Sequence, residues 1–219
     1  MKSMMKSYMV IGLGRFGTEV ARKLCDLGCE VLVLDTKSDL VQQLSSTVTN
    51  AVVGDARDKE VLRALGARNF DCAIVAVGDS LADSVLATMN LKELGVNYIV
   101  CKAHDETHRQ VLVKLGADRV VIPEQENAMR LARSLCSPNV LDYIELSDEY
   151  GIIEVPAPER WKNKTLKALT VRAKIGVNII AIRQEGHINV SPSADYEIQE
   201  DDILVILGDN EALNAFQGL

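Results

Sequence analysis

The sequence predicts an α/β fold in which helices cover both faces of a parallel sheet. Short apolar runs rich in Val and Ile recur six times between residues 8 and 123, and segments of helical periodicity separate them. Continuous apolar runs are expected of strands that are buried on both faces. A regular alternation of strands and helices favours parallel pairing. A glycine-rich turn, residues 12–17, follows the first run and is typical of a doubly wound sheet.

Each element of this sheet can be placed from the pattern. The six predicted strands are the apolar runs 8–13, 30–35, 51–54, 72–77, 98–101 and 119–123. The predicted helices are 16–27, 37–46, 80–94, 105–115 and 125–136. Three helices end in the tripeptides DLG, ELG and KLG, where glycine is expected in a left-handed C-terminal cap. Residues 1–138 are therefore predicted to form a Rossmann-like, doubly wound parallel sheet of six strands.

The pattern changes after Ser137-Pro138-Asn139, which breaks the last helix. From Glu145 the elements are shorter, with predicted strands at 151–158, 176–183, 187–192 and 201–208 and a helix at 165–174. The stretch RQEGHI, residues 183–188, is typical of a hairpin between two strands. Residues 139–219 are therefore predicted to form a small α+β domain. Its core would be thin, so association would add buried surface.

Composition argues against several classes of function. The formal net charge is −7, whereas nucleic-acid binding and polybasic membrane anchors both need clustered Lys and Arg. The sequence contains no run of about 18 apolar residues, so we expect no membrane-spanning helix. The five cysteines show no metal-type spacing and are expected to be free thiols in a reducing compartment. We expect a cytoplasmic protein that does not bind nucleic acid.

The glycine-rich turn has the features of a nucleotide site. Gly12 permits the tight turn, Gly14 lets a phosphate approach the backbone, and Gly17 lets the next helix pack closely on the strand. The unpaired N–H groups at the start of that helix favour an anion. Asp35 lies 23 residues after Gly12, where a carboxylate accepts hydrogen bonds from ribose hydroxyls and disfavours the 2′-phosphate of NADP.

Further candidates lie where later strands end, at the edge where open α/β sheets bind ligands. Asp55 and Ala56 follow the third strand and are predicted neighbours of adenine, with an ordinary loop as the alternative. Lys102 follows the fifth strand and could reach a phosphate, with a solvated lysine as the alternative. The remaining candidates for cofactor binding are Phe16, Ala76 and Gly78.

Arg15 places a positive charge inside the glycine-rich turn. Backbone N–H groups already satisfy a bound pyrophosphate. An arginine at this position therefore implies further negative charge, such as the β- or γ-phosphate of a nucleotide or an acidic partner surface. A solvated arginine on the first helical turn is the alternative.

The sequence shows no recognisable catalytic arrangement. A dehydrogenase needs a proton-transfer group and a substrate pocket besides its cofactor. His104 and His108 have a spacing that could hold a metal, but Asp105 occupies the position of Glu in H-E-x-x-H. We expect two polar residues at a helix start rather than a zinc site. A nucleotide site without such chemistry indicates a sensor rather than an enzyme.

Taken together, these stretches resemble the cytosolic regulatory subunits of bacterial Ktr/Trk potassium-uptake systems, which contain a domain regulating potassium conductance (RCK). The resemblance is closest to the Ktr type and covers nearly the whole chain. It is carried by VIGLGRFG (10–17), LGARNFDCAIVAVG (65–78), LVKLGADRVVIPE (112–124), NVLDYIELSDEY (139–150), VRAKIGVNIIAIR (171–183) and EIQEDDILVILG (197–208).

The resemblance implies a gating function. Such subunits form dimers that assemble into an octameric ring beneath a membrane potassium-translocating subunit, at the inner face of the membrane. They bind ATP or ADP, and NAD(H) in some relatives, and nucleotide exchange changes the shape of the ring. A small NAD-dependent oxidoreductase and a free-standing nucleotide or redox sensor are the alternatives.

The resemblance also implies roles for particular residues. Arg15 matches the family arginine that reaches the terminal phosphate of ATP across the dimer. Glu124 matches the family carboxylate that helps bind a divalent cation, Mg or Ca, between subunits. The C-terminal RCK domain resembles one that binds cyclic di-AMP in some members, although NIIAI also reads as an ordinary strand. The positions matched there are Arg172, Asn178, Ile179 and Ile180.

Overall fold

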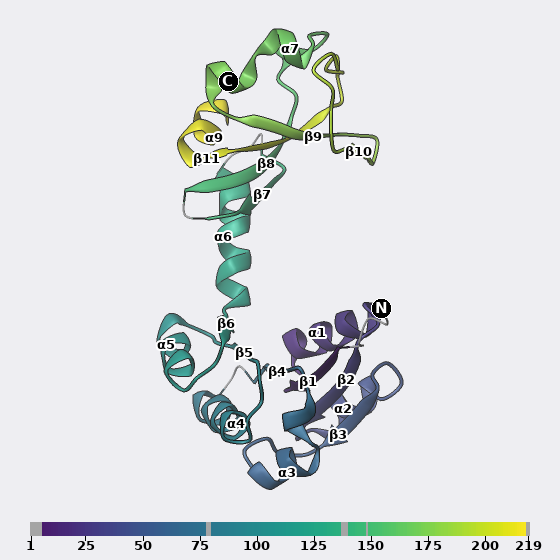
Figure 1. The fold of residues 1–219 in the computed structure, drawn as a ribbon, viewed down its shortest axis with the longest axis vertical. Coiled ribbons are helices and arrows are strands. Elements are labelled where there is room, and N and C mark those ends of the chain that lie inside the picture. Colours follow the sequence, from purple (N-terminus) through teal and green to yellow (C-terminus); the bar gives the residue numbers. More distant parts are fainter. Residues whose placement is uncertain (1–5, 78–79, 137–139, 148, 218–219) are drawn as a thin grey trace. The chain divides into compact units, whose positions relative to one another are not determined.

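The computed structural model describes residues 6–77, 80–136, 140–147 and 149–217. The chain divides into two compact units, Met1–Glu124 and Gln125–Leu219, each with its own sheet and apolar core (Figure 1). The domain boundary expected at residues 138 and 139 falls outside the described residues and stays a prediction.

The first unit is built on a six-stranded parallel sheet with the strand order β3-β2-β1-β4-β5-β6, which confirms the predicted fold class. The strands are β1 (Ser7–Ile11), β2 (Glu30–Asp35), β3 (Asn50–Val53), β4 (Cys72–Val75), β5 (Ile99–Lys102) and β6 (Arg119–Val121). The helices are α1 (Arg15–Asp26), α2 (Ser38–Leu44), α3 (Lys59–Ala64), the 3-10 turn η1 (Ala67–Asn69), α4 (Leu81–Glu93) and α5 (Glu106–Lys114). Helix α6 (Pro123–Cys136) follows β6. The strand order reverses between β1 and β4, and ligands bind at such a reversal.

Both faces of this sheet are buried, which explains the continuous apolar runs. The adjacent residues Met9 and Val10 are both fully buried, but they belong to different apolar clusters. The cluster with Met9 includes Leu62 of α3, Leu91 of α4 and Leu112 of α5. The cluster with Val10 includes Ala21 of α1 and Leu44 of α2. Each fully buried aliphatic side chain contributes about 1.5–3 kcal/mol.

Glycines end three helices of this unit as expected. Gly28, Gly95 and Gly116 have φ angles of +78°, +78° and +96°, the left-handed region that glycine adopts without a steric penalty. Helix α3 was not expected from the sequence. It has six residues and a single buried side chain, Leu62, so no helical periodicity can develop.

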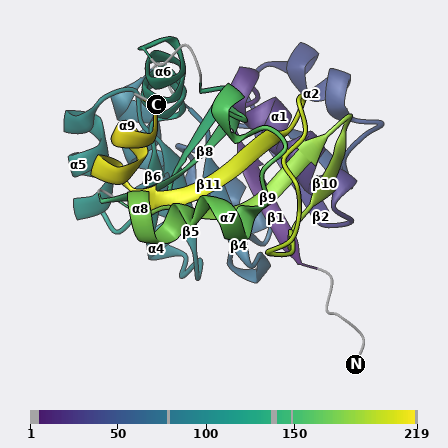
Figure 2. The same cartoon turned by 90° about the horizontal axis from the view of Figure 1, so that it is seen from above.

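The second unit contains an antiparallel sheet of five strands in the order β10-β9-β11-β8-β7, and Figure 2 shows β11 beside β8 and β9. The strands are β7 (Asp142–Glu145), β8 (Tyr150–Pro156), β9 (Asn178–Gln184), β10 (His187–Asn189) and β11 (Ile203–Asp209). The helical elements are η2 (Glu159–Trp161), α7 (Leu166–Leu169), α8 (Val171–Ile175) and α9 (Asn210–Gln217). The predicted small α+β domain is confirmed.

Two local features of this unit differ in how well the sequence predicted them. The hairpin between β9 and β10 is present, and Glu185 and Gly186 at its tip both have positive φ angles. The single helix expected at 165–174 is instead the pair α7 and α8, because Thr170 adopts a φ of +48° between them. Strand β7 and helix α9 were not expected.

Candidate nucleotide-binding site

A pocket of about 530 Å³ opens in the first unit, within the range of small-molecule sites. The glycine-rich turn, the ends of β2, β3, β4 and β5 and the start of α4 all contribute to its lining. The predicted site residues that line it are Gly12, Gly14, Arg15, Phe16, Asp35, Asp55, Ala56, Ala76, Lys102 and Glu124. Residues predicted from separate parts of the sequence therefore lie around one cavity.

The other predicted site residues lie elsewhere. Gly17 does not line the pocket; a Cβ atom there would overlap the carbonyl oxygen of Gly12, so Gly17 permits close packing of α1 on the turn. Gly78 falls outside the described residues. The four residues matched to a cyclic di-AMP site belong to the second unit, in α8 and β9: Arg172, Asn178, Ile179 and Ile180.

The glycine-rich turn leads into the start of α1, whose first backbone N–H groups have no intrahelical partner and lie beside the pocket. Gly12 has a φ of +90°, and a Cβ atom there would lie 3.0 Å from the backbone nitrogen of Val77. Gly14 is the N-cap of α1, with open space beside it and no side-chain cap on the helix. The first turn of α1 contains no acidic residue. These N–H groups and the helix dipole therefore suit an anion such as a phosphate.

Asp35 organises the middle of the pocket. Its carboxylate accepts hydrogen bonds from the backbone N–H of Leu13 at 2.6 Å and of Lys37 at 2.9 Å. The same side chain thereby holds both the glycine-rich turn and the loop between β2 and α2. A carboxylate can accept about four hydrogen bonds, so acceptor capacity remains for ribose hydroxyls.

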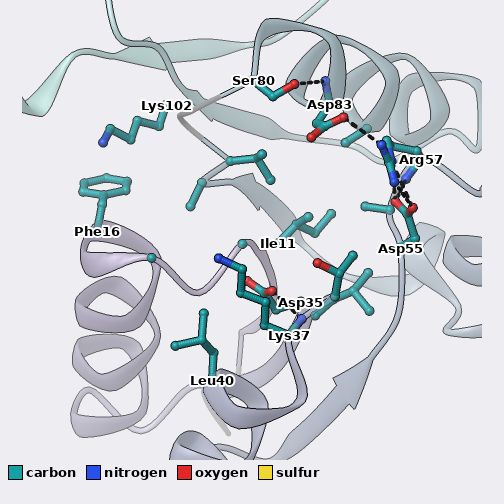
Figure 3. Close-up of a pocket in the computed structure, with 18 of the residues that line it drawn as sticks. Ile11, Phe16, Asp35, Lys37, Leu40, Asp55, Arg57, Ser80, Asp83 and Lys102 are labelled. Carbon is teal, nitrogen blue, oxygen red and sulfur yellow. Dashed lines mark hydrogen bonds and ion pairs between the residues drawn. The ribbon is translucent and has the colours of Figure 1, made fainter.

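One end of the pocket is formed by Lys102, Glu124 and Phe16 (Figure 3 shows Lys102 and Phe16). The ammonium of Lys102 donates to Oε1 of Glu124 at 2.7 Å and lies 6.0 Å from the centre of the Phe16 ring. The hydrogen bond from Lys102 is the largest factor that lowers the pKa of Glu124, and the charge of Arg15 adds to it. Glu124 is therefore ionised at neutral pH and can hold a cation.

The other end is formed by Asp55, Arg57 and Asp83 (Figure 3). The guanidinium of Arg57 donates to Oδ2 of Asp55 at 2.6 Å and to Oδ1 of Asp83 at 3.1 Å. The hydrogen bond from Arg57 lowers the pKa of Asp55. Asn90 of α4 donates to the carbonyl oxygens of Ala56 and Arg57 at 3.1 and 2.9 Å. The loop after β3 is therefore attached to α4 by side-chain and backbone contacts.

Sequence reasoning did not find Arg57 or Asp83. Arg57 follows the predicted Asp55 by two residues, but its partner Asp83 is 26 residues away in the sequence. Only the fold, in which α3 packs against α4, brings the two side chains within reach. The lining residues that were not predicted are Ile11, Leu34, Thr36, Lys37, Leu40, Gly54, Arg57, Val77, Ser80, Asp83 and Ala87.

The charged side chains that line the pocket balance one another. Four are cationic and four are anionic: Arg15, Lys37, Arg57 and Lys102 against Asp35, Asp55, Asp83 and Glu124. A nucleotide polyphosphate adds several negative charges, so an additional cation would favour its binding.

The described residues bear on two further points, metal binding and membrane crossing. No three or more His, Cys, Asp or Glu side chains are grouped in a way that could hold a metal ion. A cation at Glu124 would thus take other ligands, such as phosphate oxygens. Within the same residues, no helix has the length and apolarity to cross a membrane.

The predicted residues of the second unit occupy an irregular part of its sheet. The pairing of β9 with β11 shifts register between Ala181 and Ile179, so Ile180 falls at a bulge. Arg172 and Asn178 are exposed, and Ile179 and Ile180 are half-buried. Bulges often redirect side chains next to binding sites.

The fold and the pocket define a Rossmann-type nucleotide domain that is followed by a small antiparallel domain. The TrkA-N domain family matches residues 8–123 and the TrkA-C domain family matches residues 151–219. The chain belongs to the family of proteins that combine these two domains.

Relatives that match over nearly their full length show which members of this family the chain resembles. The chain is 44% identical over 214 residues to the Ktr system potassium uptake protein C of Bacillus subtilis (strain 168), covering 98% of this chain and 97% of that protein. It is 42% identical over 212 residues to the Ktr system potassium uptake protein A of the same organism, covering 97% and 96%. The resemblance to Ktr-type subunits that the sequence predicted is confirmed.

Solved structures share the fold. A structure of the GsuK RCK domain matches with a TM-score of 0.65 at 21% identity, covering 100% of this chain and 48% of that one. A structure of the GsuK channel bound to NAD matches with a TM-score of 0.67 at 19% identity, covering 100% and 40%. The two units therefore have the RCK fold.

Proposed function

We propose that this chain is a nucleotide-sensing subunit that gates a membrane potassium-uptake protein. The observation that carries the proposal is the pocket, where the glycine-rich turn, Asp35 and the Asp55–Arg57 pair face one cavity. Its relatives over nearly the full length are named potassium uptake proteins, which supports the link to potassium. The membrane partner is a potassium-translocating subunit, and the chain acts at the cytoplasmic face of the membrane.

The pocket suits an adenine nucleotide in one orientation. The ribose hydroxyls bind Asp35, the adenine lies near Asp55 and Ala56, and the phosphates extend from Gly14 towards Lys102. ATP and ADP are the first candidates. NAD(H) fits the same contacts, because Asp35 accepts hydrogen bonds from both free ribose hydroxyls.

Arg15 and Glu124 supply the means to distinguish ATP from ADP. A terminal phosphate beside Arg15 would compete with Glu124 for Lys102, and a divalent cation would then bind between Glu124 and the phosphate. The balanced charge of the lining favours such a cation. Mg and Ca both prefer carboxylate and phosphate oxygens.

The proposed mechanism is a shift between two arrangements of an assembly. A ligand shifts such an equilibrium only by its difference in affinity for the two states, typically 1–3 kcal/mol per coupled site. Dimers assembled into an octameric ring would add these contributions over many sites. Asp35, Asp55 and Lys102 are each engaged with a neighbour, an arrangement that favours recognition over proton transfer. We therefore propose a regulatory role and not an enzymatic one.

The second unit is proposed to bind cyclic di-AMP through Arg172, Asn178, Ile179 and Ile180. The bulge in β9 supports this proposal, because it changes which side chains the strand presents. Two half-buried isoleucines and an exposed arginine would contact a base and a phosphate, respectively.

A thermal-shift screen of the full chain with ATP, ADP, NAD, NADH and cyclic di-AMP tests the proposal. A ligand at about 100 times its Kd stabilises the folded chain by about 2.7 kcal/mol. Asp35→Ala is expected to lower the affinity for adenine nucleotides at least a hundredfold, because it removes the ribose acceptor and loosens the glycine-rich turn. Asp39→Ala, an exposed aspartate in the first turn of α2, is the control and should bind as the native chain does. A screen in which no adenine nucleotide raises the melting temperature would contradict the proposal.

A further inference from the structure

Helix α4 connects the pocket to a second polar cluster. Ser80, Asp83 and Ala87 line the pocket. Ser84 and Thr88, each one position further along, are fully buried and contact α5 and β5 instead. The contact with α5 is made by His108, which is 2% exposed and forms no part of the pocket lining.

Four polar contacts follow one another through this cluster. Nε2 of His104 lies 3.1 Å from a carboxylate oxygen of Asp105, and Nδ1 of His104 lies 2.7 Å from Nδ1 of His108. Nε2 of His108 lies 2.7 Å from the hydroxyl oxygen of Ser84. That hydroxyl lies 3.0 Å from the carbonyl oxygen of Leu81. Each of the four contacts joins two atoms that need one hydrogen between them.

The number of hydrogens decides the charge of this cluster. A neutral histidine carries one ring hydrogen and a serine carries one hydroxyl hydrogen. The two neutral histidines and Ser84 together supply three hydrogens for four contacts, so one contact lacks its hydrogen. One additional proton, which makes one ring an imidazolium, completes all four. The geometry is therefore that of a pair that holds a single extra proton.

Asp105 supplies the counter-charge for that proton. Its second carboxylate oxygen accepts from the backbone N–H of His108 at 2.7 Å and caps α5. The backbone hydrogen bond to His108 and the charges of the two histidines lower the pKa of Asp105. Burial and the charge of His104 lower the pKa of His108.

Several acidic or basic side chains on the surrounding elements have partners outside the cluster. Cys101 of β5 stays a neutral thiol, because burial raises its pKa to about 11. Among the other charged groups on neighbouring elements, these pair away from the cluster: Asp83 of α4 with Arg57, Glu93 of α4 with Lys59, Lys102 of β5 with Glu124, Glu106 with Arg109 within α5, and Asp118 before β6 with the backbone N–H of Ile99. The proton balance of the cluster is therefore set by His104, His108 and Asp105.

We propose that the His104–His108 pair is a proton-binding site through which pH changes the affinity of the pocket for nucleotide. The proton site does not depend on the proposed nucleotide function, whereas the coupling between pH and affinity rests on it. The bound proton completes the series of contacts that joins α4, through Ser84 and His108, to His104 and Asp105 at the start of α5, and α4 carries Asp83 at one end of the pocket. Coupling is reciprocal, so nucleotide binding would also promote proton uptake. Affinity should rise as the pH falls and the pair gains its proton.

The first experiment follows the histidine ring signals by NMR in the ligand-free full chain between pH 5 and 9. The chain contains three histidines, and the third, His187, is exposed in β10 of the other unit and serves as the internal control. His104 and His108 are expected to titrate together and to take up one proton between them. In His104→Gln the joint titration should disappear. Two independent, single-proton titrations would overturn the proton site.

The second experiment measures ADP affinity by calorimetry at pH 8 and pH 6 in the native chain, His104→Gln and His187→Gln. The native chain and His187→Gln should gain at least threefold more affinity on acidification than His104→Gln. Protonation of ADP itself affects all three proteins equally, so it cancels when their gains in affinity between pH 8 and pH 6 are compared. The same pH response in all three would overturn the coupling. If ADP binds none of them, the nucleotide function and the coupling fall together, while the NMR titration still decides the proton site.

Discussion

The two ends of the pocket hold their charges in different ways. At the end with Arg57, one guanidinium joins two carboxylates, and Asn90 fixes the backbone beside it. At the other end, Lys102 pairs with Glu124, whose side chain is 62% exposed. The first arrangement is preformed for recognition, and the second can exchange partners when a phosphate arrives. We infer that the Arg57 end recognises the nucleoside and that the Lys102 end responds to the number of phosphates.

Among the substitutions that test this comparison, removing the guanidinium of Arg57 should have the largest effect on nucleotide affinity. In Arg57→Ala, Asp55 and Asp83 lose their shared partner, and of the contacts between the loop after β3 and α4 only those from Asn90 to the backbone remain. We expect ATP and ADP affinity to fall by the same factor, about tenfold, or about 1.4 kcal/mol. Calorimetry with both nucleotides measures this.

Arg63→Ala is the matched control, because Arg63 pairs with Glu60 on the neighbouring helix α3 and does not line the pocket. A loss in Arg57→Ala that differs between ATP and ADP would mean that this end also senses the phosphates.

Replacing Glu124 should have a smaller effect that depends on the cation. In Glu124→Gln the carboxylate that could hold a divalent cation is lost, while a hydrogen-bond acceptor for Lys102 remains. We expect ATP affinity to fall about fivefold in the presence of Mg, a change of about 1 kcal/mol, and to change little when a chelator removes Mg. Glu126→Gln, an exposed residue of α6, is the control. An equal loss with and without Mg would argue against a cation at Glu124.

The sequence predicted the first unit better than the second for a physical reason. Strands such as β2, buried on both faces, produce continuous apolar runs that stand out from their surroundings. Strand β7 has only half-buried and exposed positions and produces no such run. Thr170 divides one predicted helix because its left-handed backbone is unusual for a β-branched residue.

In the candidate site, too, some residues could be predicted from the sequence and others could not. Glycines and Asp35 were found because local backbone geometry demands those residue types at those spacings. Asp83 was missed because its role arises from a contact with Arg57 that only the fold creates. The cluster at His104 and His108 was recognised as polar residues at a helix start, and its proton balance follows only from the distances to Ser84 and Asp105.

The most direct test of the account is the ratio of ATP to ADP affinity in the native chain and in Arg15→Ala. Calorimetry on the full chain with Mg present measures both affinities. The account predicts that Arg15→Ala lowers the preference for ATP at least threefold and leaves ADP affinity nearly unchanged, because Arg15 acts on the terminal phosphate. Equal losses of affinity for ATP and ADP would contradict the claim that the Lys102 end of the pocket responds to the number of phosphates.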